Sequence, residues 1–68
     1  MDYCKRLYDL RIDNDLRQED IAKILKISGQ AYGMYENGKR GLPIEALITL
    51  CKFYNVSADY ILGLKDTK

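Results

Sequence analysis

The stretch from Ser28 to Gly41, SGQAYGMYENGKRG, contains the residues most suggestive of phosphate chemistry. Gly33 to Lys39 fits the pattern GxxxxGK, in which a glycine-rich loop and a lysine hold nucleotide phosphates. Such a site needs Ser or Thr as the next residue to hold magnesium, whereas this sequence has Arg40. No strand-like segment precedes Gly33, and 68 residues cannot build the surrounding parallel sheet. The sequence thus argues against a nucleotide-binding loop, and leaves a helix or a turn as the alternatives.

The sequence also lacks the residue sets that support catalysis or metal binding. It has no histidine, so neither a Ser-His-Asp nor a Cys-His set can form. Its two cysteines, Cys4 and Cys51, are far apart and form no CxxC pair. Both lie among apolar residues at helical spacing, which favours reduced core thiols over a disulfide. We therefore expect no active site, no metal and no cofactor.

Composition indicates one small, soluble domain that spans residues 1–68. The chain is 47% hydrophobic and 31% charged, without an apolar run long enough to cross a membrane or to act as a secretion signal. A cytoplasmic location follows. The net charge is only +1, but residues 17–41 hold five basic and three acidic side chains, so the middle of the chain is its basic part.

Apolar residues recur at steps of three and four, which predicts an all-α fold of five helices. Ser28 and Ser57 are expected as N-caps, Pro43 as part of a first helical turn, and Asn55 as a left-handed stop. Tyrosine side chains could stack on the bases of single-stranded nucleic acid. The position of several tyrosines on apolar helix stripes favours core packing over this alternative. The expected helices are about 2–13, 18–26, 29–37, 43–54 and 58–64, and the tyrosines on stripes are Tyr32, Tyr35, Tyr54 and Tyr60.

The segment LRQEDIAKILKISGQAYGMYENGKRGLP resembles the two-helix unit of the lambda-repressor-like, XRE-type helix-turn-helix family. VSADYILG is similar to the last helix of that family, so the likeness extends from about Arg6 to Leu64. The residues that match the family pattern are Leu16, Gln18, Glu19, Ile21, Ala22, Ile27, Ser28, Tyr35, Glu36, Gly38, Lys39 and Pro43.

This resemblance implies a five-helix DNA-binding domain whose helix-turn-helix unit covers about residues 18–37. In such proteins the third helix enters the major groove, and dimers read two half-sites one helical turn apart. The resemblance further implies a structural salt bridge between Arg11 and Glu36. It also implies that Gln18 meets a DNA phosphate, with a solvated surface glutamine as the alternative.

The side of the third helix opposite Tyr32 and Tyr35 is expected to face the groove. There, Gln30 suits the adenine edge and Met34 suits a thymine methyl group. The two glycines on that side offer only a close approach of the backbone. The predicted base contacts are thus Gly29, Gln30, Gly33 and Met34. The predicted phosphate contacts are Arg17, Gln18, Asn37, Lys39 and Arg40, with a merely solvated basic loop as the alternative.

These features predict a transcriptional regulator, a bacterial or phage repressor that binds double-stranded DNA as a homodimer on a palindromic operator. Dimer contacts are expected from the C-terminal helix, at Tyr60, Ile61 and Leu64. The rival hypothesis is a protein-interaction module on the same fold, such as an antitoxin or an anti-repressor. The near-neutral charge and the two glycines of the third helix favour the rival, whereas the intact phosphate-contacting set favours the regulator.

Overall fold

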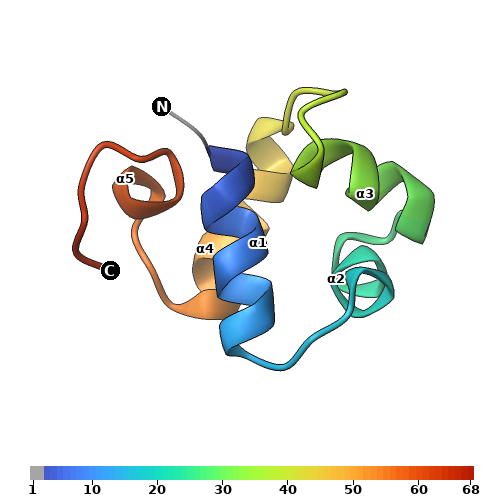
Figure 1. Ribbon diagram of the computed structural model, residues 1–68, viewed down its shortest axis with the longest axis horizontal. Helices are drawn as coiled ribbons and strands as arrows, with labels where there is room; N and C mark the ends of the chain where they lie inside the picture. The colour runs from blue at the N-terminus through green and yellow to red at the C-terminus, as the bar shows by residue number, and fades with distance from the viewer. Residues whose placement is uncertain (1–2) are drawn as a thin grey trace.

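Five helices surround one core in the computed structural model, which describes residues 3–68 (Figure 1). The predicted all-α class is confirmed, and no strand occurs in this range. The start of the first predicted helix at Asp2 lies outside the described residues. The helices are α1 (Tyr3–Asp13), α2 (Gln18–Leu25), α3 (Gly29–Glu36), α4 (Ile44–Tyr54) and α5 (Ala58–Ile61).

The helix ends follow from local chemistry that the sequence shows. The hydroxyl oxygens of Ser28 and Ser57 each accept a backbone hydrogen bond three residues on, at 3.1 Å, which confirms both predicted N-caps. Asn55 closes α4 in the left-handed conformation, with φ 56°, and Gly38 follows α3 with φ 75°. Pro43, however, is the residue before α4 and not part of its first turn, because its backbone is extended.

Helix α5 is shorter than predicted. It ends at Ile61, and Gly63 then takes φ 80°, a left-handed conformation that glycine adopts at low cost. This turn allows the backbone N–H of Leu64 to donate to the Asp59 carbonyl at 2.8 Å. The remaining residues fold back, and the Ser57 N–H donates to the Lys68 carbonyl at 3.1 Å.

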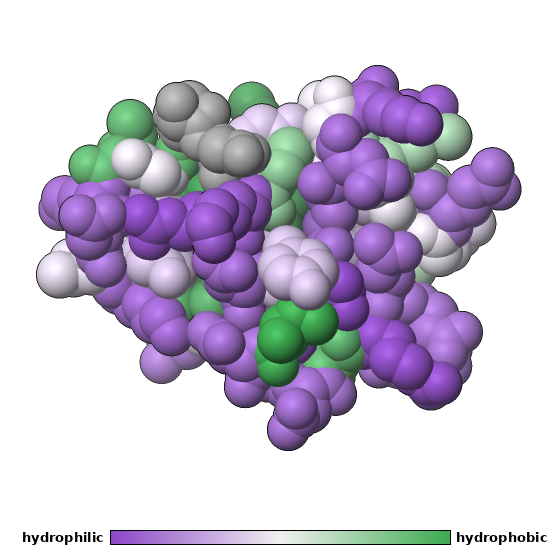
Figure 2. All heavy atoms as spheres, viewed as in Figure 1, coloured by the Kyte–Doolittle hydropathy of each residue, from purple (hydrophilic) through white to green (hydrophobic). Residues whose placement is uncertain are grey.

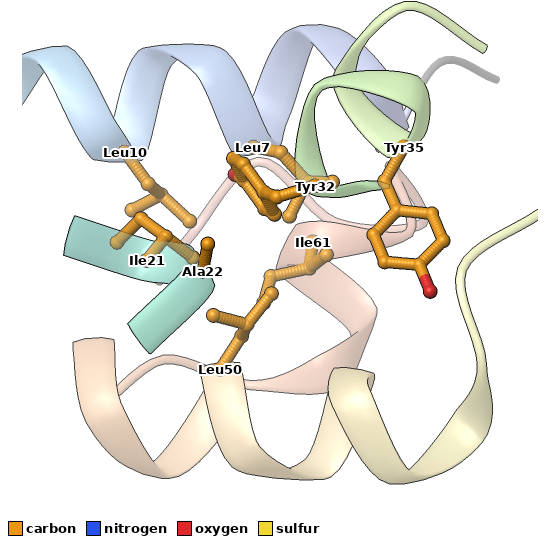
Figure 3. Close-up of a cluster of buried hydrophobic side chains, with 8 residues drawn as sticks. All are labelled: Leu7, Leu10, Ile21, Ala22, Tyr32, Tyr35, Leu50 and Ile61. Atoms are coloured by element: carbon orange, nitrogen blue, oxygen red, sulfur yellow. The ribbon is translucent and has the colours of Figure 1, made fainter. Parts of the chain in front are cut away.

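The core takes at least one side chain from every helix (Figure 3). Leu7, Ile21, Tyr32, Leu50 and Ile61 have no exposed surface at all. Each of the four aliphatic side chains among them contributes roughly 1.5 to 3 kcal/mol of transfer free energy when it leaves water. The buried hydrophobic residues that form the core are Leu7, Leu10, Ile21, Ala22, Tyr32, Tyr35, Leu50 and Ile61. Because these residues link α1 and α4 to α2 and α3, the core fixes the position of the helix-turn-helix unit.

Both cysteines are half-buried thiols, less enclosed than the sequence suggested. The Cys4 thiol donates to the Tyr35 carbonyl oxygen at 3.2 Å, and burial raises the pKa of Cys51. The two are not joined in a disulfide. Within residues 3–68, no helix is long and apolar enough to span a bilayer, and no cluster of side chains has the composition of a metal site.

Candidate nucleic-acid interface

Helix α3 packs closely on α2 through its two glycines. A Cβ atom at Gly33 would lie 3.3 Å from Oε1 of Gln18, and one at Gly29 would lie 3.8 Å from the Glu19 Cα. Gly33 is buried, so its prediction as a groove-facing base contact is wrong. The reason is geometric: positions 29 and 33 are one helical turn apart and both face α2. Gly29 is half-buried at the same contact, whereas Gln30 is exposed and Met34 is half-buried.

The salt bridge between Arg11 and Glu36 is confirmed. Nε of Arg11 donates to Glu36 Oε2 at 2.7 Å, Nη2 donates to Oε1 at 3.1 Å, and Nη1 donates to the Leu16 carbonyl at 3.0 Å. Only 11% of the Arg11 side chain and 3% of the Glu36 side chain are exposed. The pair therefore joins the end of α1 to the end of α3 and to the turn before α2.

Glu36 is also the hydrogen-bond acceptor for Gln18, a contact that the sequence analysis missed. The Gln18 amide nitrogen donates to Glu36 Oε1 at 3.3 Å. Burial disfavours the charged carboxylate, but the hydrogen bonds from Arg11 and Gln18 outweigh it, so the pKa of Glu36 is lowered. One carboxylate thus holds both the structural arginine and the predicted phosphate-contacting glutamine. The family pattern assigns roles to Gln18 and Glu36 separately, so it does not indicate that the two residues contact each other.

Arg17 stands at the start of α2 with an extended backbone and an exposed side chain. As expected for an arginine, its side chain accepts no capping hydrogen bond. The Asp20 carboxylate instead accepts from the Arg17 backbone N–H at 2.8 Å. The guanidinium lies 2.9 Å from Glu19 and 3.8 Å from Asp20, and 76% of the side chain is exposed. Exposed pairs of this kind are worth 0 to about 1 kcal/mol, so a phosphate can replace them.

The loop after α3 presents the remaining predicted phosphate contacts to solvent. Asn37, Lys39 and Arg40 are all exposed. The backbone of the loop is fixed, because the N–H groups of Lys39 and Arg40 both donate to the Met34 carbonyl, at 2.9 and 3.3 Å. Hydrophilic side chains dominate the right-hand part of the molecule in Figure 2, where α2 and α3 lie. The start of α2, the end of α3 and this loop together form what we term the polar edge, made up of Arg17, Gln18, Asn37, Lys39 and Arg40.

The predicted dimer residues divide into three different environments. Ile61 is completely buried in the core, so its prediction as a dimer contact is wrong. Tyr60 is half-buried, with the Arg6 guanidinium 4.2 Å from its ring centroid and the Lys68 ammonium 6.0 Å away. Only Leu64 is open to solvent, at 64% exposure. Apolar side chains gather near the end of α5, at the upper left of Figure 2.

A family model described as helix-turn-helix matches residues 7–61. Three curated proteins are similar to this chain over most of its length. The uncharacterized HTH-type transcriptional regulator YobD of Bacillus subtilis is 42% identical over 64 residues, and the alignment covers 94% of this chain and 57% of YobD. The cryptic phage CTXphi transcriptional repressor RstR of Vibrio cholerae is 33% identical, with 96% of this chain and 59% of RstR covered.

The third relative is the antitoxin PezA of Streptococcus pneumoniae, which is 36% identical over 87% of this chain and 37% of PezA. Among solved structures, the crystal structure of a transcriptional regulator from Listeria innocua matches with a TM-score of 0.86 and 26% identity. That match covers 90% of this chain and 57% of the other. The chain thus spans little more than half the length of the first two relatives and of this structure.

Proposed function

Since the chain belongs to the XRE-type helix-turn-helix family, we propose that it binds duplex DNA sequence-specifically and represses transcription as a homodimer on a palindromic operator. The arrangement of Gln18 and Gln30 carries this proposal. Gln30 is exposed in the first turn of α3, while Gln18 begins α2 and contacts the second half of α3, at Gly33 and Glu36. Helix α3 therefore carries a side chain suited to base edges near its start and holds one suited to phosphate near its end.

In this proposal the bases are read by few side chains. Gln30 offers paired hydrogen bonds to adenine N6 and N7, and the half-buried Met34 offers an apolar contact to a thymine methyl group. Arg17, Gln18, Asn37, Lys39 and Arg40 hold phosphates and thereby fix the register. The scarcity of base-reading groups leaves part of the specificity to DNA shape.

Dimerisation is proposed at the end of α5, with Leu64 as the open apolar contact and Tyr60 at its border. An isologous contact of this kind aligns two recognition helices with a palindrome. Action on DNA places the protein in the cytoplasm. Analytical ultracentrifugation of the chain and of Leu64→Asp tests the contact: we expect a dimer that the substitution dissociates. A wild-type monomer at micromolar concentration on operator DNA would contradict the proposed homodimer.

Selection from randomised duplex DNA, followed by gel shifts at two salt concentrations, tests the function. We expect enrichment of a palindrome and tighter binding at low salt, because binding releases counterions from the phosphates. Lys39→Ala should weaken binding to all sequences alike and reduce the salt slope by about one unit. The absence of any binding at low salt would reject the proposal.

The second candidate is a protein-interaction module, and the similarity to the antitoxin PezA favours it. The two glycines of α3 fit this alternative, because glycine has no side chain with which to contact a base. The net charge of +1 also fits it, because a low net charge attracts DNA only weakly. The same selection discriminates the two functions. A chain that binds no duplex at low salt, yet forms a stoichiometric complex with a protein encoded beside it, would be an interaction module.

A further inference from the structure

A hollow of about 460 Å³ lies between α1 and the polar edge. It is lined by residues of α1 together with residues from the start of α2 and the end of α3. The α1 residues used below are Lys5, Tyr8 and Arg11, and the others are Gln18, Glu36 and Asn37. Two residues proposed as phosphate contacts, Gln18 and Asn37, therefore both line the hollow. Neither the sequence nor the family match gives a ligand role to Lys5 or Tyr8.

We propose that this hollow is a seat for one DNA-backbone phosphate, to which α1 contributes Lys5 and Tyr8 alongside Gln18 and Asn37. The inference rests on the proposed DNA-binding function and adds a third element to its interface. Phosphate oxygens accept hydrogen bonds from amide N–H groups and hydroxyls, and an ammonium group attracts them as a point charge. The four side chains supply all three kinds of donor.

The charges around the hollow favour an anion. Among the described residues that line it, Glu36 is the acidic one, but that carboxylate is only 3% exposed and receives two hydrogen bonds from Arg11. The Arg11–Glu36 pair is neutral as a whole, so Lys5 brings the remaining charge of the described lining, although it is itself paired with Asp9. The Lys5 ammonium lies 3.1 Å from Asp9 in a pair whose side chains are 73% and 40% exposed. Such an i,i+4 pair contributes little, so a phosphate can compete for the lysine.

Tyr8 is 50% exposed although it is a large aromatic residue. Its ring lies beside Arg11, whose guanidinium carbon is 5.4 Å from the ring centroid. Tyr8 is thus held against a side chain that Glu36 fixes in place, and its hydroxyl is not required by the core. A tyrosine presents a donor at little entropic cost, because its side chain has only two torsion angles to fix.

Fluorescence anisotropy with labelled mixed-sequence duplex DNA tests the seat, at salt concentrations from about 50 to 200 mM. Lys5→Gln should lower the slope of log K against log salt by about 0.9, since one phosphate contact is lost. Tyr8→Phe removes only the hydroxyl. It should weaken binding roughly 3- to 10-fold without changing the slope, because no charge is lost.

Two controls match these changes elsewhere in the molecule. Lys52→Gln removes a lysine charge from the last turn of α4, and Tyr54→Phe removes a tyrosine hydroxyl from the core. Neither residue lines the hollow, so both variants should bind like wild type. Circular dichroism confirms that all four variants fold. An unchanged slope for Lys5→Gln, or unchanged affinity for Tyr8→Phe, would overturn the role of that residue.

The result also separates this inference from the function on which it rests. Wild-type protein that binds DNA, together with α1 variants that bind equally well, would overturn the seat and leave the DNA-binding function standing. Wild-type protein that binds no mixed-sequence duplex at about 50 mM salt would overturn both.

Discussion

Arg11 and Arg17 are six positions apart and carry the same side chain, yet their surroundings differ completely. Arg11 lies in what we term the buried seam, formed by Arg11 and Glu36, where its guanidinium makes three hydrogen bonds. Arg17 belongs to the polar edge and is 76% exposed. Its acidic neighbours Glu19 and Asp20 are on its own helix and are themselves partly in water.

This difference shows how burial decides the use of a charge. The desolvated arginine of the seam depends on its partner, because an unpaired buried charge is strongly unfavourable. The exposed arginine is solvated with or without its partners and can exchange them for a phosphate at small cost. The same residue type thus holds the fold in one region and is available to a ligand in the other.

The largest expected effect comes from breaking the seam. Arg11→Met and Glu36→Gln should each lower the free energy of unfolding by about 3 to 5 kcal/mol, because each leaves one buried partner uncompensated. Arg17→Met, the matched change at the polar edge, should alter it by less than about 0.5 kcal/mol. Urea denaturation measures all three. Equal stability of Arg11→Met and Arg17→Met would abolish the distinction between the two regions.

Below the ordinary glutamate pKa, acid should weaken the seam. The folded pKa of Glu36 is lowered, so its contribution is complete above the ordinary glutamate pKa of about 4.3 and is lost as the pH falls through the lower folded value. Wild type should therefore lose stability below about pH 4.3 more steeply than Glu36→Gln. Thermal unfolding across this range provides the comparison, and parallel curves would show that Glu36 contributes nothing specific.

Gly33→Ala tests whether the seam positions a residue of the polar edge. The added methyl group would lie 3.3 Å from Gln18 Oε1 and displace that amide from Glu36. We expect DNA binding to weaken several-fold, while a gain of up to about 1 kcal/mol in helix propensity offsets the lost contact in stability. Gly29→Ala is the control, since its methyl group meets Glu19 only at ordinary contact distance. Equal DNA affinity of the two variants would mean that Gln18 needs no such positioning.

The smallest effect is expected for a buried polar group without a partner. The Tyr54 hydroxyl is buried and has no hydrogen-bond partner among residues 3–68, and burial raises the pKa of Tyr54 to about 12. Tyr54→Phe should change the free energy of unfolding by less than about 1 kcal/mol, or increase it. Chemical denaturation tests this, and a loss comparable to that of Arg11→Met would show that pairing is not what distinguishes the seam.

Much of the fold could be predicted because its signals are local. The caps at Ser28 and Ser57 and the left-handed stop at Asn55 depend on the residue and its immediate neighbours. The end of α5 could not be predicted in this way. Gly63 can end a helix or follow one, and the turn that it makes uses a backbone hydrogen bond from Leu64 to Asp59.

The sequence predicted which residues could form the site, but not which way each of them faces. Gln30, Lys39 and Arg40 are exposed as expected. Gly33 and Ile61 were assigned to surfaces but are buried, because helical periodicity gives the faces of a helix without telling which neighbour covers each face. No sequence pattern placed Tyr8 at the hollow, although it stands three residues after Lys5 and so shares its helix face.

The sequence by itself determined the five helices, because spacing and residue type encode them, and it determined the helix-turn-helix family through its motif. The resemblance to that family then implied the partnership of Arg11 with Glu36. Only the tertiary structure decided that Gly33 packs on Gln18, that Glu36 also holds Gln18, and that Lys5 and Tyr8 border the same hollow as Asn37. These relations depend on the packing of helices that are distant along the chain. No local pattern contains that information.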